Sequence, residues 1–173
     1  MTITQFNVGT LLQEPVGSRR EIHFETNNSA ADSDENNQYF YGLVEMIKIQ
    51  QGILVSAKLT VADVAMNCAG CLTEFTKEIN IEFEEEYLPT YDLETNRPIP
   101  ADEDVFRINN RMILDITEAI RQYTETAIPI APKCREMCAG ICTLCGKDLN
   151  QSTCACDSNE GDNQFGPLKE YFK

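Results

Sequence analysis

The most regular pattern of apolar and polar positions lies in the middle of the chain. Apolar residues occupy every second position from Ile53 to Val61 and again from Ile79 to Phe83. This alternation predicts two strands with one buried face each, the second over residues 76–88, because successive side chains of a strand point to opposite sides. The alternation changes phase near Asp63, which predicts a β-bulge at that point.

Three further strands are expected before this pair, and the last of them ends at a glutamine–glycine turn signal. They cover residues 6–8, 21–24 and 39–50. Residues 26–38 contain no apolar side chain larger than alanine, so we expect a mobile loop there. A second loop, rich in proline and acidic residues, is expected at 89–104.

One helix is expected over residues 115–128. Asp115 is a favourable N-cap, and Glu118 follows three residues later, as in a capping box. Pro129 is expected to end the helix. The apolar stripe of this helix, spaced by four, three and four residues, consists of Ile116, Ile120, Tyr123 and Ala127.

The charge of the chain is strongly negative. Its 173 residues, enough for one domain with a small appendage, include 28 acidic and 14 basic residues, a formal net charge of −14. Such a surface repels the phosphate backbone, so direct RNA binding is disfavoured and a basic partner is favoured. Simple solubility is the alternative explanation of the charge.

The acidic residues are concentrated in one part of the sequence. Eleven acidic and two basic residues lie between Glu74 and Asp104. Alternate positions of the strand at 76–88 share one face, which the apolar pattern places toward solvent. We therefore expect a partner-binding surface that consists of Glu82, Glu84, Glu86, Asp102, Glu103 and Asp104.

No targeting or membrane segment is apparent. The chain has no run near the ~18 apolar residues of a membrane span. Its first residues carry neither a basic start nor a continuous apolar run, so no secretory signal is predicted. We expect a cytoplasmic protein with no membrane partner.

Eight cysteines form four close pairs in the sequence. In a reducing compartment such clusters more often hold metal than form disulfides, and tetrahedral zinc takes four thiolates. Cys142 and Cys145 are separated by two residues and followed by Gly146, as in a turn that presents two sulfurs to one ion. Cysteine spacing alone does not distinguish zinc from iron.

The four pairs can form two sites in three ways, and loop closure favours the most local arrangement. One site then consists of Cys142, Cys145, Cys154 and Cys156, in a compact knob like a zinc ribbon. The other, of much longer range, consists of Cys68, Cys71, Cys134 and Cys138. This second set would tie the hairpin tip at 68–71 to the segment after the helix.

These patterns together predict an α+β fold. An antiparallel β-meander packs on one main helix, and a cysteine-rich zinc ribbon-like knob follows. We expect three parts in the chain. They are a β-rich domain at residues 1–131, a cysteine-rich segment at 132–157 clasped to the hairpin tip, and a tail at 158–173.

Other chemistries are less well supported. A redox Cys-x-x-Cys motif normally opens a helix, whereas Cys68 and Cys71 precede a strand. A disulfide framework would need an oxidising compartment. His23, the only histidine, lies far from every cysteine, and Glu84–Glu86 are better explained as a solvated strand edge than as acid–base residues. With no nucleophile or nucleotide-binding motif in the sequence, we expect a protein that is not an enzyme.

Cys68 and Cys71 are followed by Leu72 and an acidic strand. The segment after the helix contains Ala131-Pro132-Lys133-Cys134, Ala139-Gly140-Ile141-Cys142, Cys145-Gly146 and Leu149-Asn150. In these motifs the chain resembles the YceD family, named for large ribosomal RNA subunit accumulation. The likeness covers roughly residues 40–157. Gly70 and Thr143 depart from it, because the family often has a basic or polar residue at the first position and a proline at the second.

The resemblance implies a function in assembly or maintenance of the large ribosomal subunit. It also implies a basic large-subunit ribosomal protein or a pre-ribosomal particle as partner, and it agrees with the local pairing of cysteines. We therefore expect a non-enzymatic factor for 23S rRNA accumulation with about two zinc ions per chain. Two alternatives stay open. One is an RNA-binding zinc module in which Arg135 and Lys147 meet phosphate, and the other is a thiol redox or zinc-carrier protein.

Overall fold

The computed structural model describes residues 3–24, 39–92, 95, 97–100 and 105–156. The chain divides into two compact units. The first, here called the sheet unit, comprises Met1–Ala65 and Thr76–Ile130. The second, here called the cysteine unit, comprises Met66–Phe75 and Ala131–Lys173, and therefore contains all eight cysteines.

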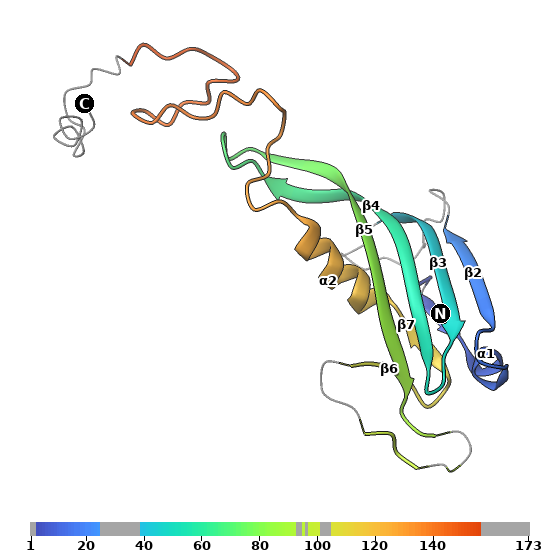
Figure 1. The fold of residues 1–173 in the computed structure, drawn as a ribbon. Coiled ribbons are helices and arrows are strands. Elements are labelled where there is room, and N and C mark those ends of the chain that lie inside the picture. The colour runs from blue at the N-terminus through green and yellow to red at the C-terminus, as the bar shows by residue number, and fades with distance from the viewer. Residues whose placement is uncertain (1–2, 25–38, 93–94, 96, 101–104, 157–173) are drawn as a thin grey trace, which may run out of the picture. The chain divides into compact units, whose positions relative to one another are not determined.

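A five-stranded sheet with the order β2-β3-β4-β5-β6 dominates the fold (Figure 1). β2 pairs antiparallel with β3, and β3 pairs antiparallel with β4. At the other end β6 runs parallel to β5, with Leu88 opposite Arg107. The strands are β2 (Arg19–Phe24), β3 (Phe40–Lys48), β4 (Ile53–Asn67), β5 (Glu74–Pro89) and β6 (Phe106–Ile108).

Side-chain pairs indicate that β4 and β5 are antiparallel neighbours. Ser56 contacts Glu84, Lys58 contacts Glu82, and Thr60 contacts Asn80. The partners advance in opposite directions along the two strands, as antiparallel pairing requires. The first four strands of the sheet thus follow one another in chain order.

A second, two-stranded sheet joins the two ends of the sheet unit's sequence. β1 (Gln5–Asn7) pairs antiparallel with β7 (Ile113–Asp115). The helix α1 (Gly9–Gln13) follows β1, and α2 (Thr117–Ala127) follows β7. Within the described ranges, neither helix has the length and apolar character needed to cross a bilayer.

The sequence pattern of the two long strands is confirmed. All five apolar positions that alternate in β4, from Ile53 to Val61, are buried, as are Ile79, Ile81 and Phe83 of β5. Asp63 has a φ of 53°, and burial resumes at Val64 on the shifted phase. The change of phase at Asp63 is therefore real, and its cause is a left-handed residue inside the strand.

The helix is at the predicted place, but its start and its capping differ from the prediction. α2 begins at Thr117 with Ile116 as N-cap, and Asp115 belongs to β7. The Asp115 carboxylate nevertheless accepts the Thr117 N–H at the start of the helix. Glu118 does not close a capping box, since its carboxylate accepts hydrogen bonds from Arg121 and Gln122.

The buried stripe of α2 also differs from the prediction. Ile116 and Ile120 are buried and Tyr123 is half-buried, but Ala127 is exposed and Thr124 is buried instead. The buried Thr124 hydroxyl has a hydrogen-bond partner, because it donates to the Ile120 carbonyl. Tyr123 stacks on Phe83 of β5 at 4.8 Å between ring centroids, and its hydroxyl donates to Glu85.

Three elements were not predicted, namely α1, β6 and β7. The two strands have three residues each, too few for an alternating pattern to emerge. Because β6 pairs parallel to β5, the sheet is mixed rather than a purely antiparallel meander. The described part of the chain is mostly β with few helices.

Some sequence predictions concern residues outside the described ranges. They include the loop at 26–38, part of the acidic loop at 89–104 and the tail at 158–173.

Candidate metal centres

The turn between β4 and β5 positions the first cysteine pair. The Cys68 N–H donates to the Thr73 carbonyl, and the Leu72 N–H donates back to the Cys68 carbonyl. Leu72 takes a φ of 61°, which reverses the chain within the turn. The pair thus lies in the turn that joins two strands, where the sequence pattern predicts a hairpin tip, and both cysteines are buried.

The segment after α2 brings the second pair of thiols to this turn. The Ala69 N–H donates to the Pro132 carbonyl, and the Cys134 N–H points at Cys68 Sγ at 3.4 Å. Cys138 Sγ lies 3.7 Å from Cys68 Sγ, and Cys134 Sγ lies 3.7 Å from Cys71 Sγ. We call Cys68, Cys71, Cys134 and Cys138 the first tetrad.

The geometry of the first tetrad fits a tetrahedral ion. Its four sulfurs all lie within 4.8 Å of one another. With Zn–S bonds of about 2.3 Å, the sulfurs at the corners of a tetrahedron are about 3.8 Å apart. Two of the observed S···S distances are 3.7 Å, and all four cysteines are free thiols rather than disulfides.

Gly70 packs closely against the first tetrad. A Cβ at this position would lie 3.2 Å from Cys138 Sγ and 3.8 Å from Cys68 Sγ. The first distance is tight and the second is an ordinary van der Waals contact. A side chain at this position would therefore require a small shift of the Cys138 thiol.

The second tetrad consists of Cys142, Cys145, Cys154 and Cys156, whose sulfurs also lie within 4.8 Å of one another. The Cys142 N–H donates to the Lys147 carbonyl, and the Gly146 N–H donates to the Cys142 carbonyl. Gly146 has a φ of 73°, a backbone conformation that residues with a side chain rarely adopt. The structure thus brings the eight thiols together in the two groups that locality favours.

Hydrogen bonds lower the pKa of some thiols in both tetrads. The N–H groups of Cys71 and Cys134 lower the pKa of Cys68 to about 6. Those of Cys145 and Leu144 lower the pKa of Cys142 to about 6. Hydrogen bonds to the charged sulfur favour the thiolate, which is the form that binds metal.

Other thiols of the tetrads are shifted the opposite way. Burial raises the pKa of Cys134 to about 11, and the hydrogen bond with Cys145 raises the pKa of Cys156 to about 12. Four thiolates repel one another at these distances unless a cation lies among them. Each set of four sulfurs also leaves no open ligand position, which is typical of structural rather than catalytic sites.

The acidic residues of β5 are exposed, as the apolar pattern predicts. Glu82, Glu84 and Glu86 all face away from the buried side of the strand. Glu82 is paired with Lys58 at 2.6 Å, and Glu84 accepts from the Ser56 hydroxyl at 3.3 Å. These β4 partners were not foreseen. The remaining predicted residues of this surface, Asp102, Glu103 and Asp104, lie outside the described residues.

Two basic residues of the cysteine unit are engaged locally. The Arg135 guanidinium lies beside Cys134, and the hydrogen bond with that sulfur raises the pKa of Arg135. Lys147 Nζ donates to the Thr153 carbonyl at 3.3 Å.

Sequence reasoning assigned no role to two polar residues that contact the first tetrad. Thr73 Oγ1 lies 3.4 Å from Cys71 Sγ, and Asn150 Nδ2 donates to Cys138 Sγ at 3.5 Å. Thr73 lies two residues after Cys71, a spacing that could have indicated the contact. Asn150 is far from Cys138 in sequence, so only the fold reveals its position.

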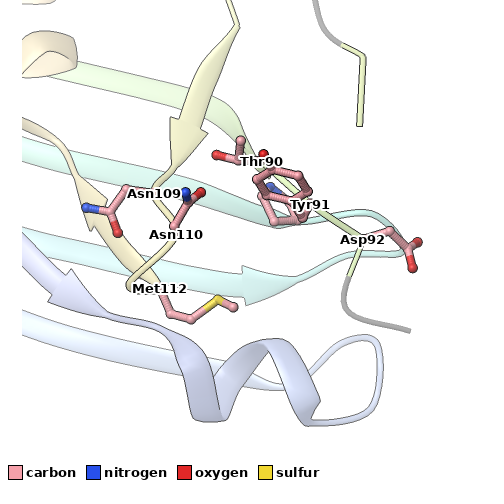
Figure 2. A pocket seen from close by; sticks show the side chains of 7 residues that line it. Thr90, Tyr91, Asp92, Asn109, Asn110 and Met112 are labelled. Carbon is pink, nitrogen blue, oxygen red and sulfur yellow. The ribbon is translucent and has the colours of Figure 1, made fainter. Parts of the chain in front are cut away.

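A polar hollow of about 490 Å³ lies elsewhere, in the sheet unit (Figure 2). Thr90 and Tyr91 from the segment after β5 face Asn109, Asn110 and Met112 from the β6–β7 turn. Asn109 Oδ1 already accepts from the Arg111 and Ile113 N–H groups. None of the described residues that line the hollow is a cysteine or one of the three exposed β5 glutamates.

Comparison with known proteins now adds to this geometry. A protein of Arabidopsis thaliana, named large ribosomal RNA subunit accumulation protein YCED homolog 1, chloroplastic, is 38% identical over 55 residues. The matched part is 32% of this chain and only 17% of that relative. No solved structure matches the chain. Residues 57–171 match the family described as large ribosomal RNA subunit accumulation protein YceD, and the chain belongs to this family.

Proposed function

We propose that this protein is a non-catalytic factor in biogenesis of the large ribosomal subunit, required for accumulation of its 23S rRNA. The observation that carries the proposal is the match of residues 57–171 to a family named for that process. The match includes part of β4, all of β5 and α2, and all eight cysteines. Both units therefore contribute to what the family shares.

The first element of the proposal is that each tetrad holds one zinc ion. The S···S distances near 3.7 Å, the free thiols and the amides aimed at Cys68 and Cys142 support this assignment. Four thiolates around Zn²⁺ leave a site with a charge of about −2 and no position for substrate. The ions would order the cysteine unit, and the chemistry they supply is structural.

The second element is that the acidic face of β5 captures a basic partner. Glu82, Glu84 and Glu86 lie exposed on one side of the strand, in a chain of net charge −14. Such a field accelerates encounter with lysine- and arginine-rich proteins and weakens with salt. The partner we propose is a basic large-subunit ribosomal protein, free or within a pre-ribosomal particle.

The alternative of an RNA-binding zinc module is less well supported. Its phosphate contacts would have to come from Arg135 and Lys147. Arg135 is hydrogen-bonded to the Cys134 sulfur, and Lys147 donates to the Thr153 carbonyl. Both cations are thus engaged within their own unit, which makes them less available to a nucleic acid backbone.

A thiol redox or zinc-carrier function is a further alternative. It requires thiols that react with oxidants or release metal readily. In the first tetrad Cys68 and Cys71 are buried, which restricts access. A chelator should therefore remove zinc from the first tetrad of the full-length protein slowly, whereas a carrier would release it at once.

Binding kinetics with purified components test the proposed function. The full chain should associate with at least one basic large-subunit protein in preference to naked 23S rRNA, and the association rate should fall as salt rises. Preferential binding to rRNA, with no basic protein bound, would favour the RNA-binding alternative. Depletion of the protein in cells should lower 23S rRNA more than 16S rRNA.

A further inference from the structure

The two tetrads are linked through a short segment that belongs to both. Cys138 is the last residue of the first tetrad and Cys142 the first of the second, with only three residues between them. A single β-bridge pairs Ile141 with Asp148, which lies in the loop that joins the two halves of the second tetrad. That loop therefore returns to the segment that begins at Cys138.

Backbone hydrogen bonds extend this link to the hairpin tip. The Ile141 N–H donates to the Gly70 carbonyl at 3.1 Å, and the Leu149 N–H donates to the Gly140 carbonyl at 2.9 Å. Gly140 takes a φ of 73°, and a Cβ there would lie 3.2 Å from the Gly70 oxygen. These hydrogen bonds thus connect the turn of the first tetrad to the loop of the second.

Asn150 joins the loop of the second tetrad directly to a thiol of the first. Its Nδ2 donates to Cys138 Sγ at 3.5 Å, and its Oδ1 accepts the Ala139 N–H at 2.8 Å. Asp148 fixes the side chain, because its Oδ1 accepts both the Asn150 N–H and Nδ2. The amide is therefore held in one orientation, with its donor toward sulfur and its acceptor toward the backbone.

We infer that the two tetrads bind metal cooperatively and that Asn150 is the positioning residue that couples them. The inference rests on the proposal that both tetrads bind zinc. An ion in the second tetrad orders the loop between Cys145 and Cys154, and this loop presents the Asn150 amide to Cys138. Ordering of that thiol in advance lowers the cost of binding an ion in the first tetrad.

The coupling must be reciprocal, since a linkage between two binding sites changes both affinities by the same factor. Outer groups that hydrogen-bond to metal ligands typically change metal affinity by about 10–100-fold. We expect about a tenfold effect, because one amide contacts one of four sulfurs. The first tetrad should therefore bind more weakly when the second is disabled.

Chelator competition on the full chain tests this inference, with Zn²⁺ as the metal and Co²⁺ absorption as an independent report of thiolate ligation. A double variant with Cys145→Ser and Cys154→Ser disables the second tetrad. In this variant the zinc affinity of the first tetrad should fall about tenfold. In an Asn150→Ala background the same disabling should cost about threefold or less, because the coupling amide is already absent.

Asn150→Asp and Ser152→Ala sharpen the test without removing any thiol. Asn150→Asp keeps an acceptor for the Ala139 N–H but loses the donor to sulfur, so it should weaken the first site at least as much as Asn150→Ala. Ser152 is exposed in the same loop, and only its backbone contacts Asp148, so Ser152→Ala should bind zinc like the parent protein.

Three outcomes would overturn the inference. An affinity of the first tetrad that is unchanged when the second is disabled would show independent sites. An equal loss from Asn150→Ala with and without the second tetrad would show that Asn150 acts only on Cys138. Absence of zinc from both tetrads of the parent protein would overturn the metal proposal as well, which separates that failure from the first two.

Discussion

The sheet unit and the cysteine unit are stabilised by different interactions. The sheet unit has a continuous apolar core, in which residues such as Val44, Val55 and Leu114 are wholly buried. Between residues 131 and 156, all of which the structure describes, the chain forms no helix or strand beyond the bridge of Ile141 with Asp148. Most side chains of that segment are exposed.

This difference indicates which unit depends on metal for its folding. Apolar burial and a hydrogen-bonded sheet can stabilise the sheet unit on their own. The cysteine unit exposes Met137 and Leu144, by 91% and 65%, and has little apolar surface to bury. Small domains of this kind commonly fold only when a metal ion is bound. We therefore expect chelation to unfold the cysteine unit and leave the sheet unit folded.

The largest expected effect comes from loss of a ligand of the first tetrad. Cys71→Ser should unfold more of the chain than Cys154→Ser, because the first tetrad joins segments far apart in sequence and the second is local. Loss of a structural zinc removes on the order of 10 kcal/mol of apparent binding energy. Far-UV circular dichroism with thermal melts compares the two variants, and equal or greater damage from Cys154→Ser would contradict the prediction.

A core substitution should affect only the sheet unit. Phe83 is 3% exposed and stacks on Tyr123, so Phe83→Ala should lower the free energy of unfolding of this unit by about 3–5 kcal/mol. The zinc content should stay unchanged. Met137→Ala is the control, because an exposed side chain of the cysteine unit should contribute less than about 0.5 kcal/mol. Loss of zinc from Phe83→Ala would mean that the units are not energetically distinct.

The electrostatic attraction to the partner should also come from the sheet unit. Replacement of Glu82, Glu84 and Glu86 by Gln should leave the fold intact, since all three side chains are exposed. It should slow association with a basic partner about tenfold at low salt and flatten the salt dependence. Arg135→Ala with Lys147→Ala is the matched change in the cysteine unit. If the protein binds RNA, and only the Arg135→Ala and Lys147→Ala variant weakens that binding, the proposed function is wrong.

The smallest expected effect concerns the contact of α2 with the sheet. The Tyr123 hydroxyl donates to Glu85 at 2.6 Å, and Tyr123→Phe removes this bond while keeping the stacked ring. The free energy of unfolding should fall by about 1–2 kcal/mol, as for a hydrogen bond to a charged group in a partly exposed place. Thermal melts of the variant and the parent measure it. No change would show that water replaces the hydroxyl at no cost.

The sequence predicted the features that repeat or that depend on spacing. The alternation in β4 and β5 is long enough to reveal both buried faces, and Asp63 is visible as a break in it. The grouping of eight thiols follows from the small entropy cost of closing short loops. Asp115 shows the limit of such patterns, because a good capping residue can equally end a strand. β7 is too short to produce an alternating pattern in the sequence.

The remaining features depend on contacts between residues far apart in sequence. β6 joins the sheet through a parallel pairing that no local pattern encodes. Lys58 meets Glu82 only because β4 and β5 are neighbours, and Asn150 meets Cys138 only because its loop folds back. A spacing rule identifies ligands that lie in one turn, but not the groups around them that orient the thiols.

Metal analysis of the full chain, purified without added metal, tests the central claim most directly. Elemental analysis with native mass spectrometry should find about two zinc ions per chain and no colour from iron, since eight cysteines provide two sets of four ligands. Fewer than one metal ion per chain, with disulfides among these cysteines, would contradict the account.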